Sequence, residues 1–202
     1  MIIAVTNRSF CADEKAYFEQ IERIAAAGPL AVLLREKDLG HEDYRRYAAV
    51  CKKICDRYAV PLIINHEMAV ADELGIERVH LSMAEFKAAL EDDILKKYER
   101  VGVSVHSVEE AVYADANGAD YLIAGHIFLT DCKKGLPARG LDFLKDVCDA
   151  VEIPVYAIGG MDIEHGREAI AAGAEGICMM SQMMKSGHPE NTTRVFLEVK
   201  PH

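Results

Sequence analysis

The sequence lacks three features, and each absence excludes a class of protein. No apolar run approaches the roughly 20 residues that span a membrane. The first residues, MIIAVTNRSF, have no basic segment ahead of the apolar ones. Basic residues are not in excess, because 23 Lys and Arg stand against 33 Asp and Glu, a net charge of −10. We therefore expect a soluble cytoplasmic protein without a signal peptide that binds neither membranes nor nucleic acid.

Cysteine pairs of the CxxC type are also missing. Cys51 and Cys55 are four residues apart on one face of an expected helix, but no second pair of ligands is near them in the sequence. A structural zinc site takes four ligands. We therefore expect the six cysteines to be small apolar residues in a reducing compartment.

Short apolar runs alternate with longer amphipathic stretches along the whole chain. The runs are continuously apolar, which is typical of strands buried on both faces of a parallel sheet. Gly28, Gly75, Gly118 and Gly173 each separate a helical pattern from the next run, where a left-handed helix end favours glycine. The expected strands cover residues 2–5, 30–35, 61–64, 78–81, 101–104, 120–125, 154–158 and 176–180.

Eight βα units predict a single (β/α)8 barrel domain over residues 1–202. A doubly wound sheet is the alternative, but such a sheet usually has a glycine-rich first turn, and the turn here, VTNRSF, has no glycine. The fourth helix, near residues 83–98, is the hardest to delimit. Other helices are expected over residues 17–27, 41–58, 108–117 and 164–172.

In a barrel of this kind, functional side chains lie at the carboxyl ends of the strands. Some of the polar residues there have a structural alternative: Asn65, Ser82 and Ser104 could cap helices, and His80 is expected inside the barrel. Ser107 with Glu110 resembles a capping box, which would leave His106 beside a helix start. The polar residues that follow these strands include Thr6, Asn7, Arg35, Glu36, Lys37, Asn65, His66, Ser104, His106, His126, Thr130 and Lys133.

Two short segments indicate a phosphate site. AIGGM and MMSQMM follow the seventh and eighth runs and offer main-chain N–H groups at helix starts, through Gly159, Gly160, Met180 and Ser181. Helix N-termini and nests of amides bind anions without a full positive charge, and glycine allows close approach. A protein with a charge of −10 could therefore still bind a phosphorylated ligand.

Several segments resemble the thiamin phosphate synthase superfamily in order and spacing, over roughly residues 2 to 185. They are LLREKDL, LIINH, VHLS, VGVSVHSVEEA, IPVYAIGGM and GAEGICMMS. The long segment GHIFLTDCKKGLPARG, residues 125–140, is similar to the thiazole tautomerase (TenI) branch more than to the synthase branch.

The resemblance implies isomerisation of a carboxythiazole phosphate from its exocyclic to its aromatic tautomer, with no metal, cofactor or redox step. His126 matches the family's catalytic histidine and would be the acid–base catalyst, since imidazole accepts and donates protons near neutral pH. Arg35 would contact the substrate carboxylate or orient the pocket, and Lys37 is a second candidate. An exposed flank of the barrel could support a homodimer. The other expected substrate-binding residues are Asn65, Ser104, Lys133, Gly159, Gly160, Met180 and Ser181.

Thiamin phosphate synthase itself is the alternative, joining hydroxymethylpyrimidine pyrophosphate to thiazole phosphate with Mg²⁺. The sequence departs from the synthase pattern at four positions: synthases have proline in place of His126, threonine in place of Cys132, an Mg²⁺-binding aspartate in place of His66 and glutamine in place of Leu33. A second acid follows their fourth strand, near Glu85. Mg²⁺ prefers oxygen ligands, so an imidazole at position 66 argues against synthase activity. A non-catalytic thiazole-phosphate-binding regulator is a third hypothesis.

Overall fold

The computed structural model describes residues 1–130, 135 and 137–197. Its strands form a closed barrel in the order β1-β2-β3-β4-β5-β6-β7-β8, which confirms the (β/α)8 barrel and excludes the doubly wound sheet. The chain forms two compact units, residues 1–79 with the segment from Met179 onward, and residues 80–178. The expectation of one domain over residues 1–202 stays a prediction.

The first unit contains the first three strands and the start of β4. Parallel pairing aligns Ala4 with Val32 and Leu33 with Ile63. All four residues of each of β1, β2 and β3 are buried, as the continuous apolar runs indicate. The elements are β1 (Ile2–Val5), η1 (Arg8–Phe10), α1 (Glu14–Ala26), β2 (Ala31–Leu34), α2 (His41–Arg57), β3 (Leu62–Asn65), α3 (Met68–Leu74), β4 (Arg78–Ser82), α8 (Ser181–Lys185) and α9 (Pro189–Leu197).

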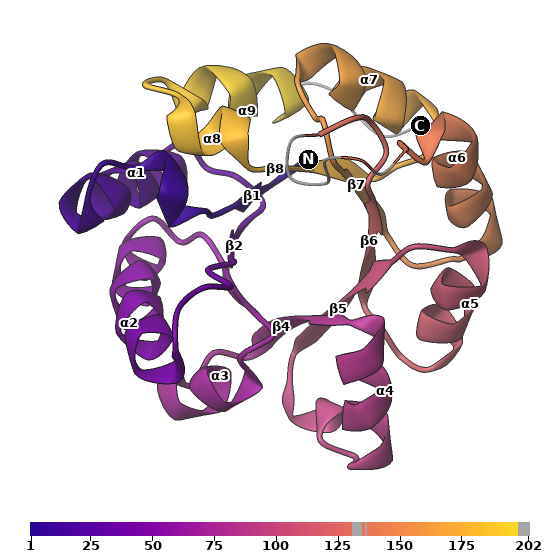
Figure 1. Cartoon of the computed structure of the whole chain (residues 1–202), viewed down its shortest axis with the longest axis horizontal. Coiled ribbons are helices and arrows are strands. Elements are labelled where there is room, and N and C mark those ends of the chain that lie inside the picture. The colour runs from indigo at the N-terminus through magenta and orange to yellow at the C-terminus, as the bar shows by residue number, and fades with distance from the viewer. Residues whose placement is uncertain (131–134, 136, 198–202) are drawn as a thin grey trace. The chain divides into compact units, whose positions relative to one another are not determined.

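Helices α1 and α2 lie side by side outside β1 and β2 (Figure 1). Aromatic rings fill the space between them: the Tyr17 and Tyr47 ring centroids are 5.2 Å apart, and Phe18 lies 5.1 Å from Tyr47. Tyr17 is fully buried. Burying such rings contributes strongly to packing. This cluster therefore holds α1 and α2 together beside β1 and β2.

The second unit continues the same βα alternation. Parallel pairing aligns Ser104 with Ile123 and Ala124 with Ala157. Glycine is required at Gly102, because a Cβ there would lie 2.0 Å from a ring carbon of Tyr121. The elements are α4 (Met83–Glu91), η2 (Leu95–Lys97), β5 (Arg100–Val105), α5 (Val108–Ala116), β6 (Tyr121–Gly125), α6 (Gly140–Ala150), β7 (Val155–Ile158), α7 (Ile163–Ala171) and β8 (Gly176–Met179).

Two helix boundaries differ from the expected ones by more than one residue. Helix α1 begins at Glu14, not residue 17, because the Asp13 side chain accepts the N–H of Ala16 and caps the helix. Helix α4 ends at Glu91, well before residue 98, because Asp93 adopts a left-handed φ of 55°. The four glycines expected at left-handed turns all have positive φ: Gly28, Gly75, Gly118 and Gly173.

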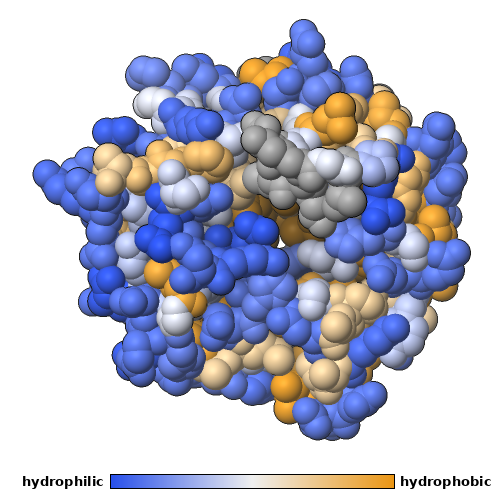
Figure 2. All heavy atoms as spheres, viewed as in Figure 1, coloured by the Kyte–Doolittle hydropathy of each residue, from blue (hydrophilic) through white to orange (hydrophobic). Residues whose placement is uncertain are grey.

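The surface over α2 and α3 is mainly hydrophilic on the face that Figure 2 shows. Within the part of the chain that the structure describes, no helix combines the length and the apolar character needed to cross a membrane. Cys11, Cys51, Cys55, Cys148 and Cys178 are free thiols, as expected, whereas Cys132 lies outside the described residues.

Candidate active site

His126 follows β6 directly and is buried, with 6 % of its surface exposed. Its Nε2 lies 2.9 Å from the carbonyl oxygen of Pro137. A carbonyl only accepts hydrogen bonds, so Nε2 carries a proton and, in the neutral ring, Nδ1 carries a lone pair. Nδ1 is buried and has no hydrogen-bond partner among the described residues. In this tautomer His126 can act as a base, because the lone pair on Nδ1 is available to accept a proton.

The turn after β7 packs directly against this histidine. Gly159 and Gly160 have φ of 101° and 67°, and a Cβ on Gly159 would lie 2.5 Å from the Cβ of His126. The ladder also continues beyond β6 and β7, since the N–H of Ile127 donates to Ile158 at 2.9 Å and that of Phe128 to Gly159 at 3.1 Å. The second unit thus brings the predicted catalyst and the predicted phosphate loop together.

His106 anchors the end of β6 from the neighbouring strand. Its Nδ1–H donates to the carbonyl oxygen of Gly125, 2.8 Å away, in the peptide that leads into His126. Ser107 caps α5 by accepting the N–H of Glu110, as the sequence indicates, but the Glu110 carboxylate accepts the N–H of His106 instead of completing a capping box on Ser107. His106 is therefore a structural support beside His126.

His80 and Ser104 form a pair inside the second unit. His80 Nε2 lies 2.8 Å from Ser104 Oγ, and the His80 ring stacks on Tyr121 with centroids 5.6 Å apart. Only 2 % of His80 is exposed, which agrees with an interior position. The alternative that Ser104 caps a helix is wrong, because it lies within β5. For Ser82 the capping alternative is right, since it forms a capping box with Glu85.

In the first unit, a buried carboxylate joins the ends of β1 and β2. Glu36 accepts hydrogen bonds from Thr6 Oγ1 at 2.6 Å, Tyr17 Oη at 3.1 Å and the N–H of Arg8 at 2.9 Å. Burial raises the pKa of the Glu36 carboxyl, and the three donors partly oppose that change. The Thr6 hydroxyl also accepts the N–H of Arg35, 3.0 Å away, so this network fixes the main chain of Arg35.

The ends of β2 and β3 are joined by Tyr44 of α2. Its hydroxyl oxygen lies 2.7 Å from the carbonyl oxygen of Leu34 and accepts the N–H of Asn65 at 3.2 Å. Burial raises the pKa of the Tyr44 hydroxyl, which keeps it protonated as a donor. Asn65 is buried, and its Nδ2 has no hydrogen-bond partner among the described residues. This amide is a ready contact for a ligand.

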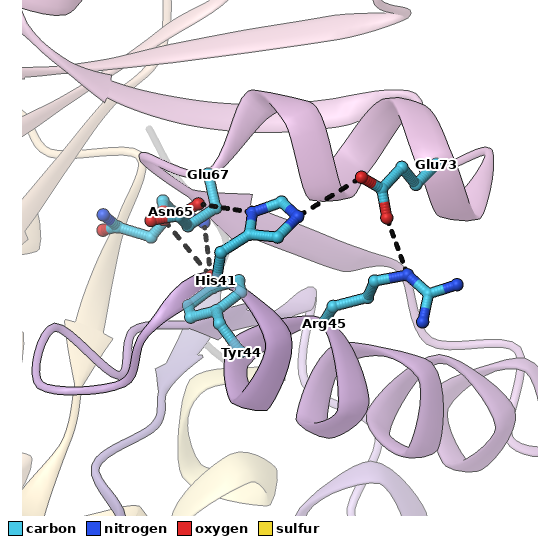
Figure 3. Close-up of polar contacts among 6 residues, drawn as sticks. All are labelled: His41, Tyr44, Arg45, Asn65, Glu67 and Glu73. Carbon is cyan, nitrogen blue, oxygen red and sulfur yellow. Dashed lines mark hydrogen bonds and ion pairs between the residues drawn. The ribbon is translucent and has the colours of Figure 1, made fainter.

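The loop after β3 is held from outside by an ionic cluster on α2 and α3. Figure 3 shows the ring of His41 between Glu67 and Glu73, with Arg45 on the second oxygen of Glu73. The nitrogen–oxygen distances are 3.6 Å to Glu67, 3.3 Å from His41 to Glu73 and 2.6 Å from Arg45. These side chains are partly exposed, so each contact contributes little to stability.

The remaining predicted residues are divided between the two units. Met180 and Ser181 begin α8, which Gln20 ties to α1 by donating to the carbonyl of Met183 at 2.7 Å. Lys37 is exposed after β2, and Lys133 lies outside the described residues. Thus Arg35, Lys37, Asn65, Met180 and Ser181 belong to the first unit, and Ser104, His126, Gly159 and Gly160 to the second. Glu36 was given no role from the sequence. The only signal in the sequence is an acidic residue next to an expected buried strand.

The residues at the expected synthase metal positions do not suit Mg²⁺. His66 offers an imidazole and follows β3 with a left-handed φ of 68°. The Glu85 carboxylate accepts the N–H and the hydroxyl of Ser82, at 2.8 and 2.7 Å, to complete the α4 cap. In the described ranges no three His, Cys, Asp or Glu side chains are grouped to hold a metal ion. Mg²⁺ prefers oxygen ligands, usually one or two carboxylates, so an imidazole at position 66 and a carboxylate engaged in a helix cap do not fit it.

The fold is a (β/α)8 barrel, and titratable side chains and groups that can bind an anion follow the carboxyl ends of its strands. This is the arrangement of (β/α)8 enzymes. The chain belongs to the thiamine monophosphate synthase family, whose model matches residues 2–183.

Two curated relatives are named thiamine-phosphate synthase. One, from Clostridium acetobutylicum, is 33 % identical over 195 residues, covering 96 % of this chain and 92 % of its own. Another, from Clostridium botulinum, is 34 % identical over 181 residues, covering 89 % and 88 %. The solved thiamine phosphate pyrophosphorylase of Pyrococcus furiosus superposes with a TM-score of 0.83 at 26 % identity, covering 98 % of this chain and 93 % of that one. The resemblance to the superfamily is confirmed, and these names favour the synthase alternative over the tautomerase.

Proposed function

We propose that the protein is a thiazole tautomerase that aromatises a carboxythiazole phosphate, with His126 as acid–base catalyst. The observation that carries the proposal is the imidazole at the end of β6, whose Nε2–H donates to Pro137 and whose Nδ1 has no partner among the described residues. Aromatisation removes a proton from a ring carbon and adds one to the exocyclic carbon, with no net change in electrons. Nδ1 accepts the first proton, and the resulting imidazolium returns one.

The surroundings of His126 suit both forms of the ring. The carbonyl oxygen of Pro137 accepts from Nε2 in the neutral ring and, more strongly, in the imidazolium. Burial of the ring excludes water from Nδ1. Gly159 and Gly160 are the proposed phosphate contacts of the second unit, and Met180 with Ser181 those of the first. Arg35, Lys37, Asn65, Ser104 and Lys133 are proposed to bind the rest of the substrate.

Thiamin phosphate synthase is the second candidate, and the names of the curated relatives support it better than they support the tautomerase. Against it stand His66 at a position where a carboxylate would be needed and Glu85 engaged in a helix cap. Either reaction uses a phosphorylated thiazole, so the two candidates share a ligand and differ in the chemical step.

Two assays on one preparation separate the candidates. Enzymatically made exocyclic carboxythiazole phosphate is followed by absorbance as it becomes aromatic, and thiamin phosphate is measured after incubation with pyrimidine pyrophosphate, thiazole phosphate and Mg²⁺. We expect turnover in the first assay only. Thiamin phosphate formation without aromatisation would establish the synthase, and thiazole phosphate binding without turnover in either assay would establish a binding protein.

The His126→Gln variant tests the catalyst. Glutamine can still donate to Pro137 from the place of Nε2, but it has no titratable lone pair, so we expect kcat to fall at least about 100-fold. His188→Gln is the matched control, since His188 is exposed and far along the chain. Full activity of the His126→Gln variant would remove His126 from the mechanism.

A further inference from the structure

His165, in the first turn of α7, contacts the turn that contains the two adjacent glycines. Its Nδ1–H donates to the carbonyl oxygen of Gly160 at 2.7 Å, and its own main-chain N–H donates to Asp162 at 2.8 Å. Asp162 Oδ2 also lies 3.5 Å from Nδ1. Because a carbonyl oxygen only accepts, the Gly160 contact places a proton on Nδ1.

The other side of this arrangement is an aromatic stack. The rings of His165 and Phe128 have centroids 4.0 Å apart and planes inclined by 14°. Phe128 lies two residues after His126, and its N–H donates to the carbonyl of Gly159 at 3.1 Å. His165 thus contacts both the loop after β7 and the loop that begins with His126.

Space between these two loops is minimal. A Cβ on Gly160 would lie 2.5 Å from the carbonyl oxygen of Leu129 and 2.7 Å from the Cβ of Phe128. The positive φ of Gly160, 67°, gives the main chain a conformation that few other residues adopt. A turn of this kind is sensitive to the direction of its peptide groups, and the Gly160 carbonyl is fixed by the His165 ring.

We propose that His165 is a positioning residue for phosphate recognition, which holds the Gly160 peptide against Phe128 so that the N–H groups of the turn, rather than its carbonyl oxygen, meet the anion. The proposal rests on the thiazole phosphate ligand of the proposed function. A carbonyl oxygen turned toward a phosphate would repel it. The hydrogen bond from His165 holds the Gly160 carbonyl oxygen, so it favours binding of the phosphorylated ligand over the same ligand without phosphate. His165 touches no substrate atom and acts through Gly160.

The test compares two ligands that differ only in the phosphate: hydroxyethylthiazole phosphate and the corresponding hydroxyethylthiazole alcohol. Calorimetric titration of the wild type and of His165→Ala gives the ratio of the two affinities. Loss of one net hydrogen bond corresponds to about a tenfold change in Kd. We expect His165→Ala to bind the phosphate about tenfold more weakly and the alcohol unchanged.

Two further variants separate positioning from folding. His165→Asn places an amide donor near the position of Nδ1 and should restore phosphate affinity to within about threefold of the wild type. Phe128→Leu removes the stack and keeps the hydrogen bond, so it should weaken phosphate binding less than His165→Ala does. An unchanged affinity ratio in His165→Ala, or an equal loss for both ligands, would overturn the role of His165. Failure of the wild type to bind thiazole phosphate would instead overturn the proposed ligand.

Discussion

Glu36 is a carboxylate that three donors hold inside the first unit: Thr6 just after β1, Arg8 in η1 and Tyr17 in α1. Removing it would leave buried donors without an acceptor, which costs about 1–3 kcal/mol each. Its burial raises its pKa, so the folded protein binds this proton more tightly than the unfolded chain does.

This difference predicts how stability changes with pH. The stabilisation by protonated Glu36 is present below the unfolded pKa, about 4.3, and is lost as the pH rises through the folded pKa. Compared with Glu36→Gln, which cannot lose a proton, the wild type should lose free energy of unfolding as the pH rises above about 4. Urea denaturation at several pH values measures both proteins. A free energy of unfolding of the wild type that stays constant or rises with pH relative to that of Glu36→Gln would contradict the prediction.

The sequence could place His126 and Glu36 at strand ends, because continuous apolar runs show where buried parallel strands stop. It could not give the tautomer of His126, since the acceptor that determines it belongs to Pro137, eleven residues along the chain. Nor could it show that Glu36 is shared by three donors, because Thr6 is 30 residues away and Tyr17 is 19 away. Such contacts depend on how strands and helices pack, which no local pattern contains.

At the scale of elements, the hydrogen bonds between β6 and β7 continue past the ends of both strands, as far as Gly159. The strands and most helices follow from apolar runs and turn glycines. The early start of α1 depends on Asp13 and the early end of α4 on the left-handed Asp93. An aspartate is compatible with either a helix or a cap, so these boundaries required the structure.

Gly159→Ala tests how closely the two strand ends depend on each other. The new Cβ would meet His126 at 2.5 Å, and the positive φ adds strain of about 1–3 kcal/mol. We expect destabilisation and loss of turnover together. Gly118→Ala is the control, because Gly118 also has a positive φ, 86°, but open space around its Cβ. Equal unfolding midpoints and equal activity of the two variants would show that the contact with His126 is unimportant.

At the scale of the whole molecule, buried thiols occur in both units. Cys51 and Cys55 lie on α2 and Cys178 on β8, all buried. Burial raises the pKa of Cys55 to about 12 and also raises the pKa of Cys51 and Cys178. The thiolate is the reactive form of cysteine. Folding therefore protects these three thiols from chemical modification in two ways: burial excludes the reagent, and the raised pKa keeps the thiol protonated.

Among the cysteines that the structure describes, alkylation at pH 8 should therefore modify the partly exposed Cys11 first, with Cys51, Cys55 and Cys178 at least about 100-fold slower. Burial raises the pKa of Cys148 to about 11, so we expect an intermediate rate there. Mass spectrometry of peptides after timed labelling measures each site. Labelling of Cys51 in the folded protein as fast as that of Cys11 would contradict the buried packing of α2.

The three histidines near the turn have acceptors of one kind: His106, His126 and His165 all donate to main-chain carbonyl oxygens. A main-chain oxygen is present whatever side chain its residue carries. Substitutions at the accepting residues that preserve the backbone therefore leave these rings in the same tautomer. In an evolving lineage, the proton arrangement of this region would change by replacement of the histidines themselves or by movement of the backbone, and much less by drift among their neighbours.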